Sequence, residues 1–157
     1  MDRDELTARL ALLSEADATG TAQFQQAAAA SYGVGITEMR ALSILVREGP
    51  QSAGALVAAL HVTSGAVTGI VDRLIAKGLA RRAPDPDDRR RIVVTPDLEG
   101  LASGESPYAG IGAAFAELYE GYTVAELEFL ARHLESSIAI TSRESGRLRR
   151  AQAPEAP

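Results

Sequence analysis

The chain has 157 residues, of which 46% are hydrophobic, so it can bury one moderate core and lacks the composition of a disordered protein. It has no Cys, which excludes disulfides, zinc–thiolate sites and a thiol redox switch, and its 4% of aromatic residues argue against a stacking platform for single-stranded nucleic acid. With a net charge of −5, binding to nucleic acid would require a local basic face.

The N-terminal segment predicts a helix over residues 4–31. Leu6, Leu10 and Leu13 have the i, i+4, i+7 spacing of one helical face. The charged residues 1–5 lead into no apolar signal segment, and no apolar run in the chain approaches the ~18 residues needed to cross a bilayer. We therefore expect a soluble, cytoplasmic protein that does not associate with a membrane.

A second helix is predicted after Thr37, which is a suitable N-cap, and it should stop at Gly49-Pro50. Apolar residues recur in it at helical intervals, so one face should pack into the core. The side chains expected to be buried there are Met39 or Ala41, Leu42, Leu45 and Val46.

Two short helices joined by a tight link follow. Ser52 can cap the first, over residues 53–60, and Thr63 or Ser64 can cap the second, which should end at Lys77-Gly78. The buried stripe of the second is expected to comprise Val67, Ile70, Val71, Leu74 and Ile75. Such a pair is typical of a helix-turn-helix, in which the second helix is the recognition helix.

Directly after this pair, residues 79–83 and 91–95 predict two strands around a loop rich in turn residues. A hairpin in this place is typical of a wing. From Arg73 to Arg91 the chain carries seven of its sixteen basic residues and three aspartates, a local balance of +4 (7 − 3). An acidic protein with one such face still concentrates a positive field there.

The C-terminal third predicts further helices. Asp97 can cap a fifth helix, but glycines and a proline weaken the prediction until residues 113–119. Thr123 and Glu126 then have the spacing of a capping box, and they precede apolar residues at helical intervals. A long last helix is therefore expected.

The segment from Leu56 to Gly100 resembles the MarR family of bacterial regulators. The resemblance rests on the recognition-helix pattern TSGAVTGIVDRL at 63–74 and on the wing pattern GLARR at 78–82, followed by DPDDRR at 85–90. Tyr119-Glu120-Gly121 and the final helix also look like the dimerisation end of that family. The resemblance implies a homodimer whose terminal helices intertwine, with one winged module per lobe.

Two departures from the family pattern affect the interpretation. Gly69-Ile70 stand where relatives often place Asn or Arg, which weakens the expected base readout. Pro96-Asp97 replace the family's Leu-Thr before the fifth helix, and aspartate caps a helix as well as threonine does. The fold prediction therefore stands.

The expected fold is mainly α with a small β-hairpin wing, a winged helix-turn-helix with N- and C-terminal dimerisation helices. Its expected divisions are an N-terminal dimerisation helix (1–35), the winged helix-turn-helix DNA-binding module (36–97), C-terminal dimerisation helices (98–150) and a disordered tail (151–157).

Small residues on the exposed face of the recognition helix would let it lie deep in a major groove, where hydroxyls bond base edges and methyl groups contact thymine. The residues predicted to contact DNA from this helix are Thr63, Ser64, Gly65, Thr68, Gly69 and Arg73. The alternative is that Ser64 is only a cap and that the glycines relieve packing. With few long polar side chains, specificity would depend largely on DNA shape.

In the wing, Arg90 matches the family's wing-tip arginine and would enter a minor groove, where a narrow A·T tract concentrates negative potential. Asp88 would hold Arg90 through a charge-assisted bond, and Arg89 and Arg91 would contact phosphates. Ser52 could donate to a phosphate, although capping alone explains it. A solvated arginine-rich loop is the alternative interpretation.

The family also implies a small effector, often an aromatic anion, between the dimer helices and the DNA-binding module. The candidate cleft residues are Tyr32, His61, Tyr108, Phe115, Tyr119 and Tyr122. Ordinary core or interface packing is the alternative for each of them. A ligand would favour a dimer whose recognition helices no longer match successive major grooves ~34 Å apart.

An enzyme is not expected. His61 and His133 are the only histidines and have no partners at metal-ligand spacing, and no phosphate-binding loop or nucleophile elbow is present. No metal or cofactor is expected either. The sequence favours a sequence-specific regulator of transcription that binds double-stranded DNA, a ligand-responsive repressor acting as a homodimer on a palindromic operator. The alternative is a winged-helix module used only for protein–protein contacts, which would suit the acidic net charge.

Overall fold

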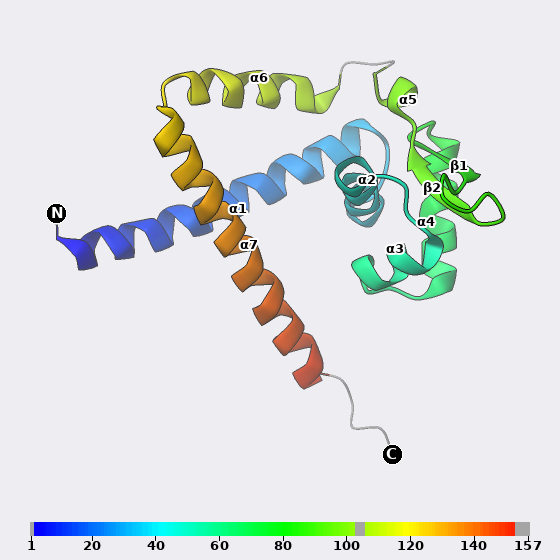
Figure 1. Ribbon diagram of the computed structural model, residues 1–157, viewed down its shortest axis with the longest axis horizontal. Coiled ribbons are helices and arrows are strands. Elements are labelled where there is room, and N and C mark those ends of the chain that lie inside the picture. The colour runs from blue at the N-terminus through cyan, green and yellow to red at the C-terminus, as the bar shows by residue number, and fades with distance from the viewer. Residues whose placement is uncertain (1, 103–105, 153–157) are drawn as a thin grey trace. The chain divides into compact units, whose positions relative to one another are not determined.

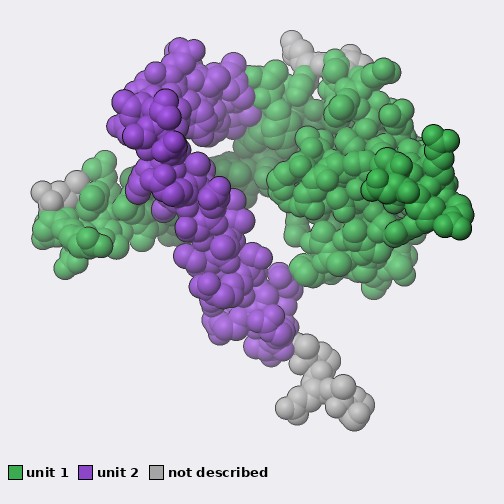
Figure 2. Space-filling view, viewed as in Figure 1, with its two compact units in different colours: residues 1–109 green, residues 110–157 purple. Residues whose placement is uncertain are grey.

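The computed structural model describes residues 2–102 and 106–152 (Figure 1). Its elements are α1 (Arg3–Ser31), α2 (Ile36–Glu48), α3 (Ala53–Leu60), α4 (Ser64–Ala76), β1 (Ala80–Pro84), β2 (Ile92–Pro96), α5 (Leu98–Ala102), α6 (Pro107–Glu120) and α7 (Val124–Gln152). They form two compact units, residues 1–109 and 110–157 (Figure 2). The predicted fold, mainly helical with a two-stranded hairpin, is confirmed.

The first unit holds the hydrophobic core. Helix α2 packs against α1, α3, α4 and β2, while α4 also packs against α3 and β1. Leu45, Leu56 and Leu74 are completely buried where these elements meet. The prediction that Val46 is buried is wrong, because it lies at the edge of the buried stripe of α2 and is 55% exposed.

Only the C-terminal end of α1 contributes to this core. Residues 2–23 are exposed, whereas Ala28 and Ala29 are buried. The helix begins at a capping box, in which the Glu5 N–H donates to Asp2 Oδ1 (2.9 Å) and the Asp2 N–H donates to Glu5 Oε2 (3.0 Å). In a single chain, most of α1 and the leucine side chains on it are therefore exposed to solvent.

Helix α2 begins earlier than predicted, with Gly35 and not Thr37 as its N-cap. The side chain of Glu38 accounts for the difference, because its carboxylate accepts hydrogen bonds from the backbone of Gly35 and from its own N–H. This is the returning half of a capping box, which needs no hydroxyl at the cap. A Cβ on residue 35 would lie 2.6 Å from Glu38 Oε2, so glycine suits that position.

Helices α3 and α4 form the predicted helix-turn-helix. Ser52 Oγ accepts from the Ala55 N–H (3.1 Å) and Thr63 Oγ1 from the Ala66 N–H (3.3 Å), so Thr63, and not Ser64, caps α4. His61 forms the link in a left-handed conformation, with φ of 56°. The two helices are bent by 106°, within the range of helix-turn-helix motifs.

The end of α4 leads directly into the hairpin. Gly78, with φ of +68°, donates to the Ile75 carbonyl and Leu79 donates to the Leu74 carbonyl, which is a Schellman cap. Strands β1 and β2 then pair antiparallel, with Arg82 opposite Val94. Both strands begin one residue later than predicted.

A single residue between α2 and α3 extends this small sheet. Gln51 exchanges backbone hydrogen bonds with Val94, with N···O distances of 2.9 and 2.8 Å. The two bonds tie the segment between α2 and α3 to the wing. A bridge formed by a single residue cannot show the alternation of apolar and polar residues that marks a strand. No sequence pattern therefore predicts it.

Asp97 caps α5 as predicted, because its Oδ1 accepts the N–H of Gly100 (3.1 Å). The glycine that weakened the prediction of this helix has a packing role. A Cβ on residue 100 would collide with the carbonyl oxygen of Gly78. Glycine at position 100 therefore lets α5 lie close to the end of α4.

Helix α6 begins at Pro107, earlier than the predicted residues 113–119. The capping box of α7 is confirmed: Thr123 N–H donates to Glu126 Oε2 (2.8 Å) and Glu126 N–H to Thr123 Oγ1 (3.3 Å). The hydrogen bonds from the side chain and then the backbone of Thr123 lower the pKa of Glu126. None of the described side chains of α6 and α7 is buried.

The prediction of a tail at 151–157 is wrong for its first two residues, because α7 continues through Gln152. Residues 153–157 lie outside the described residues. None of the described helices is by itself long and apolar enough to cross a membrane. One bent pair, α3 with α4, reaches the required length and apolar composition only when the two helices are taken together.

Thr95 provides a test of the packing beneath the wing. Its Oγ1 is buried and has no hydrogen-bond partner in the described part of the chain. Because an unpaired buried hydroxyl costs free energy, Thr95→Val should leave the free energy of unfolding unchanged or raise it by about 1–2 kcal/mol. Urea denaturation measures this, with the exposed Thr141→Val as control. A loss above about 1 kcal/mol would mean that the hydroxyl has a partner.

Candidate nucleic-acid interface

The N-terminal half of α4 presents small residues to solvent. Thr63, Ser64, Gly65 and Thr68 are exposed and Gly69 is half-buried, while Val67 and Ile70 face the core. The Thr68 hydroxyl donates to the Ser64 carbonyl (3.2 Å). The structure thus brings the predicted helix residues together on one surface, which has few side chains long enough to obstruct close approach.

Arg73 completes this surface from α4 but is bound to α2. Its Nε and Nη2 both donate to Oε1 of Glu38, each at 2.5 Å. The Arg73 side chain is 61% exposed, whereas Glu38 is 7% exposed and is the one charged residue among those described that is buried. The pair therefore joins the start of α2 to the recognition helix.

The ionisation of Glu38 depends on this arrangement. Burial raises the pKa of Glu38, but the hydrogen bonds from its own backbone N–H, Arg73 and Gly35, together with the charge of Arg73, outweigh burial and lower it. A carboxylate whose pKa is lowered in the folded state stabilises the fold at pH values above its ordinary pKa. This stabilisation is lost as the pH falls through the lowered pKa of the folded state.

Glu38→Gln should therefore lower the free energy of unfolding by about 1–3 kcal/mol at neutral pH. The difference from wild type should shrink as pH falls below about 4.5, the ordinary pKa, because the unfolded wild-type chain is protonated there, while the folded carboxylate stays ionised until the pH reaches its lowered pKa. Urea denaturation from pH 7 to pH 3 measures this. A difference that does not change with pH would contradict the assignment.

The wing is a loop closed by its own acidic residues. Asp85 Oδ1 accepts the N–H groups of Asp87 (2.9 Å) and Asp88 (3.4 Å). Asp88 Oδ1 in turn accepts the backbone N–H of Arg90 (3.1 Å) and its side-chain Nε (3.2 Å). The predicted bond from Asp88 to Arg90 is therefore present, and two of the three aspartates have roles inside the loop.

The arginines of the wing point away from the core. Arg90 is held at its Nε, yet its side chain is 91% exposed, and Arg89 and Arg91 are exposed as well. Nearby, Arg82 on β1 pairs with Asp72 on α4 (2.8 Å). The exposed cations near α4 are therefore Arg89, Arg90 and Arg91 at the wing tip, together with Lys77 and Arg81.

A cavity of about 410 Å³ lies beside α2 and is lined by Tyr32, Met39, Leu42, Ser43, Val46, Arg47, Leu101, Ser106 and Tyr108. Of the predicted effector residues it contains Tyr32 and Tyr108. Its volume suits a small ligand, and its walls are mostly apolar. His61 does not line this cavity, since it lies exposed in the turn between α3 and α4.

Tyr108 has defined contacts at the edge of this cavity. Its hydroxyl donates to Met39 Sδ (3.5 Å), and its ring meets that of Phe24 edge to face, with centroids 5.2 Å apart. Burial raises the pKa of Tyr108, and the neighbouring Tyr32 adds to the effect. The hydroxyl therefore remains a donor at neutral pH.

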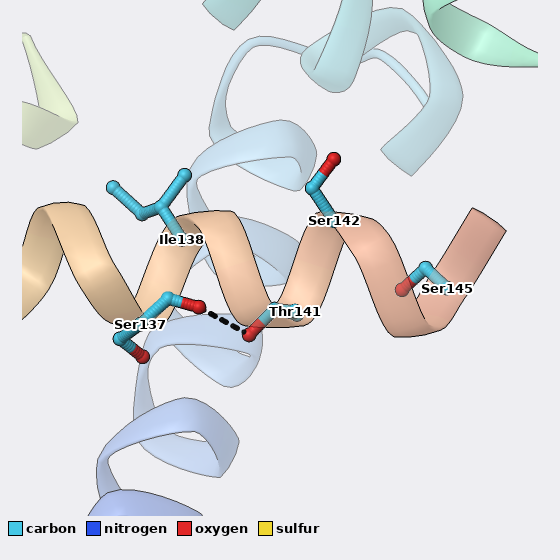
Figure 3. Close-up of a pocket in the computed structure, with 5 residues that line it drawn as sticks. All are labelled: Ser137, Ile138, Thr141, Ser142 and Ser145. Carbon is cyan, nitrogen blue, oxygen red and sulfur yellow. Dashed lines mark hydrogen bonds between the residues drawn. The ribbon is translucent and has the colours of Figure 1, made fainter. Parts of the chain in front are cut away.

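The other predicted effector residues lie in the second unit. Phe115, Tyr119 and Tyr122 form a row, with ring centroids 5.9 and 6.4 Å apart. A shallow hollow in the same unit is lined by Ser137, Ile138, Thr141, Ser142 and Ser145, all from α7 (Figure 3). In it the Thr141 hydroxyl donates to the Ser137 carbonyl (2.9 Å), a bond within the helix. Four of the five lining residues are thus serines or threonine, and the fifth is Ile138.

Glu38 and Arg47 were not predicted as site residues from the sequence. A glutamate three residues after Gly35 was the available signal for Glu38, but Thr37 offered a more familiar cap. Arg47 pairs with Glu48 (2.7 Å) at the rim of the cavity. In the described part of the chain, no group of three or more His, Asp or Glu residues is placed to hold a metal ion.

Comparisons with known proteins agree with this geometry. A model of the MarR family matches residues 32–91. An uncharacterized HTH-type transcriptional regulator of Bacillus subtilis, YcgE, is 32% identical over 147 residues, 94% of this chain and 96% of the relative. The HTH-type transcriptional repressor NicR of Pseudomonas putida is 37% identical over 91 residues, 58% of this chain and 57% of the relative.

Solved structures show the same fold. A MarR family protein from Bacillus stearothermophilus has a TM-score of 0.63 and 20% identity, covering 90% of this chain and 99% of that protein. At this level of identity the likeness concerns the fold alone.

Proposed function

Since the chain belongs to the MarR family of transcriptional regulators, which are not enzymes, we propose that it is a sequence-specific repressor that binds a palindromic operator in double-stranded DNA as a homodimer. The observation that carries the proposal is the joint exposure of the small-residue surface of α4 and of the arginines at the wing tip. A helix with small exposed residues enters a major groove, and an exposed arginine beside it reaches the adjacent minor groove.

Pairing of two chains would cover apolar side chains that one chain exposes. On α1, Leu6, Leu10 and Leu13 are 45%, 52% and 53% exposed. On α7, Phe129 and Ile138 are 61% and 67% exposed. Apolar faces of this extent mark contact surfaces, and a second copy of the chain has the same two helices to offer. The proposed divisions at 1–35, 36–97 and 98–150 follow from this assignment.

The cavity beside α2 supports a response to a small ligand, either aromatic or anionic. Its apolar walls suit a ring, and the hydroxyls of Tyr32 and Tyr108 and the guanidinium of Arg47 offer donors to a polar substituent. Helix α2 carries five of the lining residues and, through Glu38, also holds Arg73 of α4. A ligand that shifts α2 would therefore move the recognition helix.

Selection from a library of random duplexes at low salt tests the proposal, combined with light scattering to measure the mass in solution. The proposal requires that an inverted repeat is enriched and that two chains bind each duplex. Failure to enrich any duplex would favour a winged-helix module that contacts only proteins. A monomer in solution at micromolar concentration would contradict the homodimer.

A further inference from the structure

The side chain of Arg73 covers the exposed turn of α4 at Gly69. Side chains of a helix lean toward its N-terminus, and a Cβ on residue 69 would lie 3.2 Å from Arg73 Nη1. The guanidinium therefore occupies the region into which a long side chain at position 69 would project. Glycine at position 69 leaves room for Arg73. The guanidinium of Arg73 therefore supplies the polar group that a long side chain at position 69 would otherwise have placed on this surface.

The contact with Glu38 uses one edge of the Arg73 guanidinium and leaves a second edge free to donate hydrogen bonds. Nε and Nη2 donate to Glu38 Oε1, which occupies the side-on edge. The remaining N–H groups of Nη1 and Nη2 form the end-on edge, which can donate two parallel hydrogen bonds. Guanine presents the matching pair of acceptors, O6 and N7, in the major groove, whereas adenine presents a donor in place of O6.

Glu38 fixes the direction of that edge. Its carboxylate is buried and is also bonded to the backbone at Gly35, so the partner of Arg73 is itself held in place. The guanidinium borders a surface hollow of about 380 Å³, whose lining also includes Gly65 and Gly69. Because the carboxylate offsets the charge of Arg73, the arginine adds little general attraction for phosphate but keeps its directional donors.

We propose that Arg73 contacts a guanine in the major groove of each half-site through its end-on edge, and that Glu38 is the positioning residue for this contact. The inference rests on the DNA binding proposed above. It assigns a specific base contact to a recognition helix whose other exposed residues are small. The sequence specificity of the protein would then combine recognition of DNA shape with direct recognition of one guanine in each half-site.

The experiment uses the full chain and the duplex selected from the random library. Each guanine of the half-site is replaced in turn by 7-deazaguanine, which lacks the N7 acceptor but still pairs with cytosine. One replacement should weaken wild-type binding by roughly tenfold to a hundredfold and should cause no further loss in Arg73→Ala. If Arg73→Ala instead weakens binding to all duplexes alike and lowers the salt slope by about one per chain, Arg73 contacts phosphate and the proposal is overturned.

Two further variants separate base reading from folding and charge. Arg73→Lys keeps the charge and can still pair with Glu38, but it has no planar fork, so it should lose the guanine preference while folding as wild type does. Arg132→Ala, on α7, is the control and should keep the preference. Glu38→Gln should reduce the preference, and a full preference in this variant would overturn the positioning role of Glu38.

The outcomes also distinguish this inference from the proposed function. A duplex that is selected and bound, but with no guanine whose replacement depends on Arg73, overturns the guanine contact alone. Failure to select any duplex overturns both the contact and the function on which it rests.

Discussion

Arg90→Ala is expected to weaken binding to the selected operator by roughly tenfold to a hundredfold per chain engaged, while leaving the fold intact. The side chain is 91% exposed, so its removal leaves no cavity in the core. Asp88 holds Nε and leaves the outer N–H groups free to enter a narrow minor groove. Fluorescence anisotropy with a labelled duplex measures the dissociation constant, and thermal unfolding checks the fold.

A matched pair of variants tests whether the effect belongs to the wing tip. Arg132→Ala removes a similarly exposed arginine from α7 and should change the affinity little. Asp88→Asn keeps Arg90 but weakens the bond that orients it, so an intermediate loss is expected. Equal affinities of Arg90→Ala and wild type would show that the wing does not enter a groove.

Leu74→Ala should produce the largest loss of stability, about 2–5 kcal/mol in the free energy of unfolding. Leu74 is fully buried, and it lies on α4, which packs against α2, α3 and β1. Removing its side chain leaves a cavity at the base of the recognition helix. Urea denaturation at fixed protein concentration gives the value, since stability depends on concentration if the chain dimerises.

Leu98→Ala is the appropriate control because Leu98 is 66% exposed on α5. Its effect should stay within about 0.5 kcal/mol. A loss for Leu74→Ala as small as that of Leu98→Ala would mean that α4 is not packed as described. Because α4 also carries the proposed contact surface for DNA, Leu74→Ala should weaken DNA binding at temperatures where part of the protein is unfolded.

The order of the elements could be predicted from sequence because each has a local signal. The apolar period of α4, the caps at Ser52 and Thr63, and the glycine at its end agree with one another. The turn-rich loop between two short segments, the second of them rich in β-branched residues, similarly predicted the wing. The resemblance to known regulators then added proposed roles that periodicity alone does not provide, such as the entry of Arg90 into a minor groove.

Contacts between distant residues could not be predicted in this way. The pairing of Glu38 with Arg73 joins residues 35 positions apart, and it depends on how α2 and α4 cross. Gly100 by itself predicts a weak helix, whereas its position against Gly78 follows from packing that no local pattern contains. The cavity beside α2 similarly combines residues from α2, α5 and α6 with Tyr32, which follows the end of α1.

The salt dependence of binding to the selected operator tests the central claim most directly. Each phosphate contact releases a counterion, so the logarithm of the binding constant falls by about 0.9 per contact for each unit of log salt concentration. Arg89 and Arg91 in two chains make four phosphate contacts and imply a slope of about −3.6 or steeper. Such a slope with two chains per duplex would support a DNA-binding regulator, whereas no binding to any duplex at low salt, or a slope near zero, would contradict it.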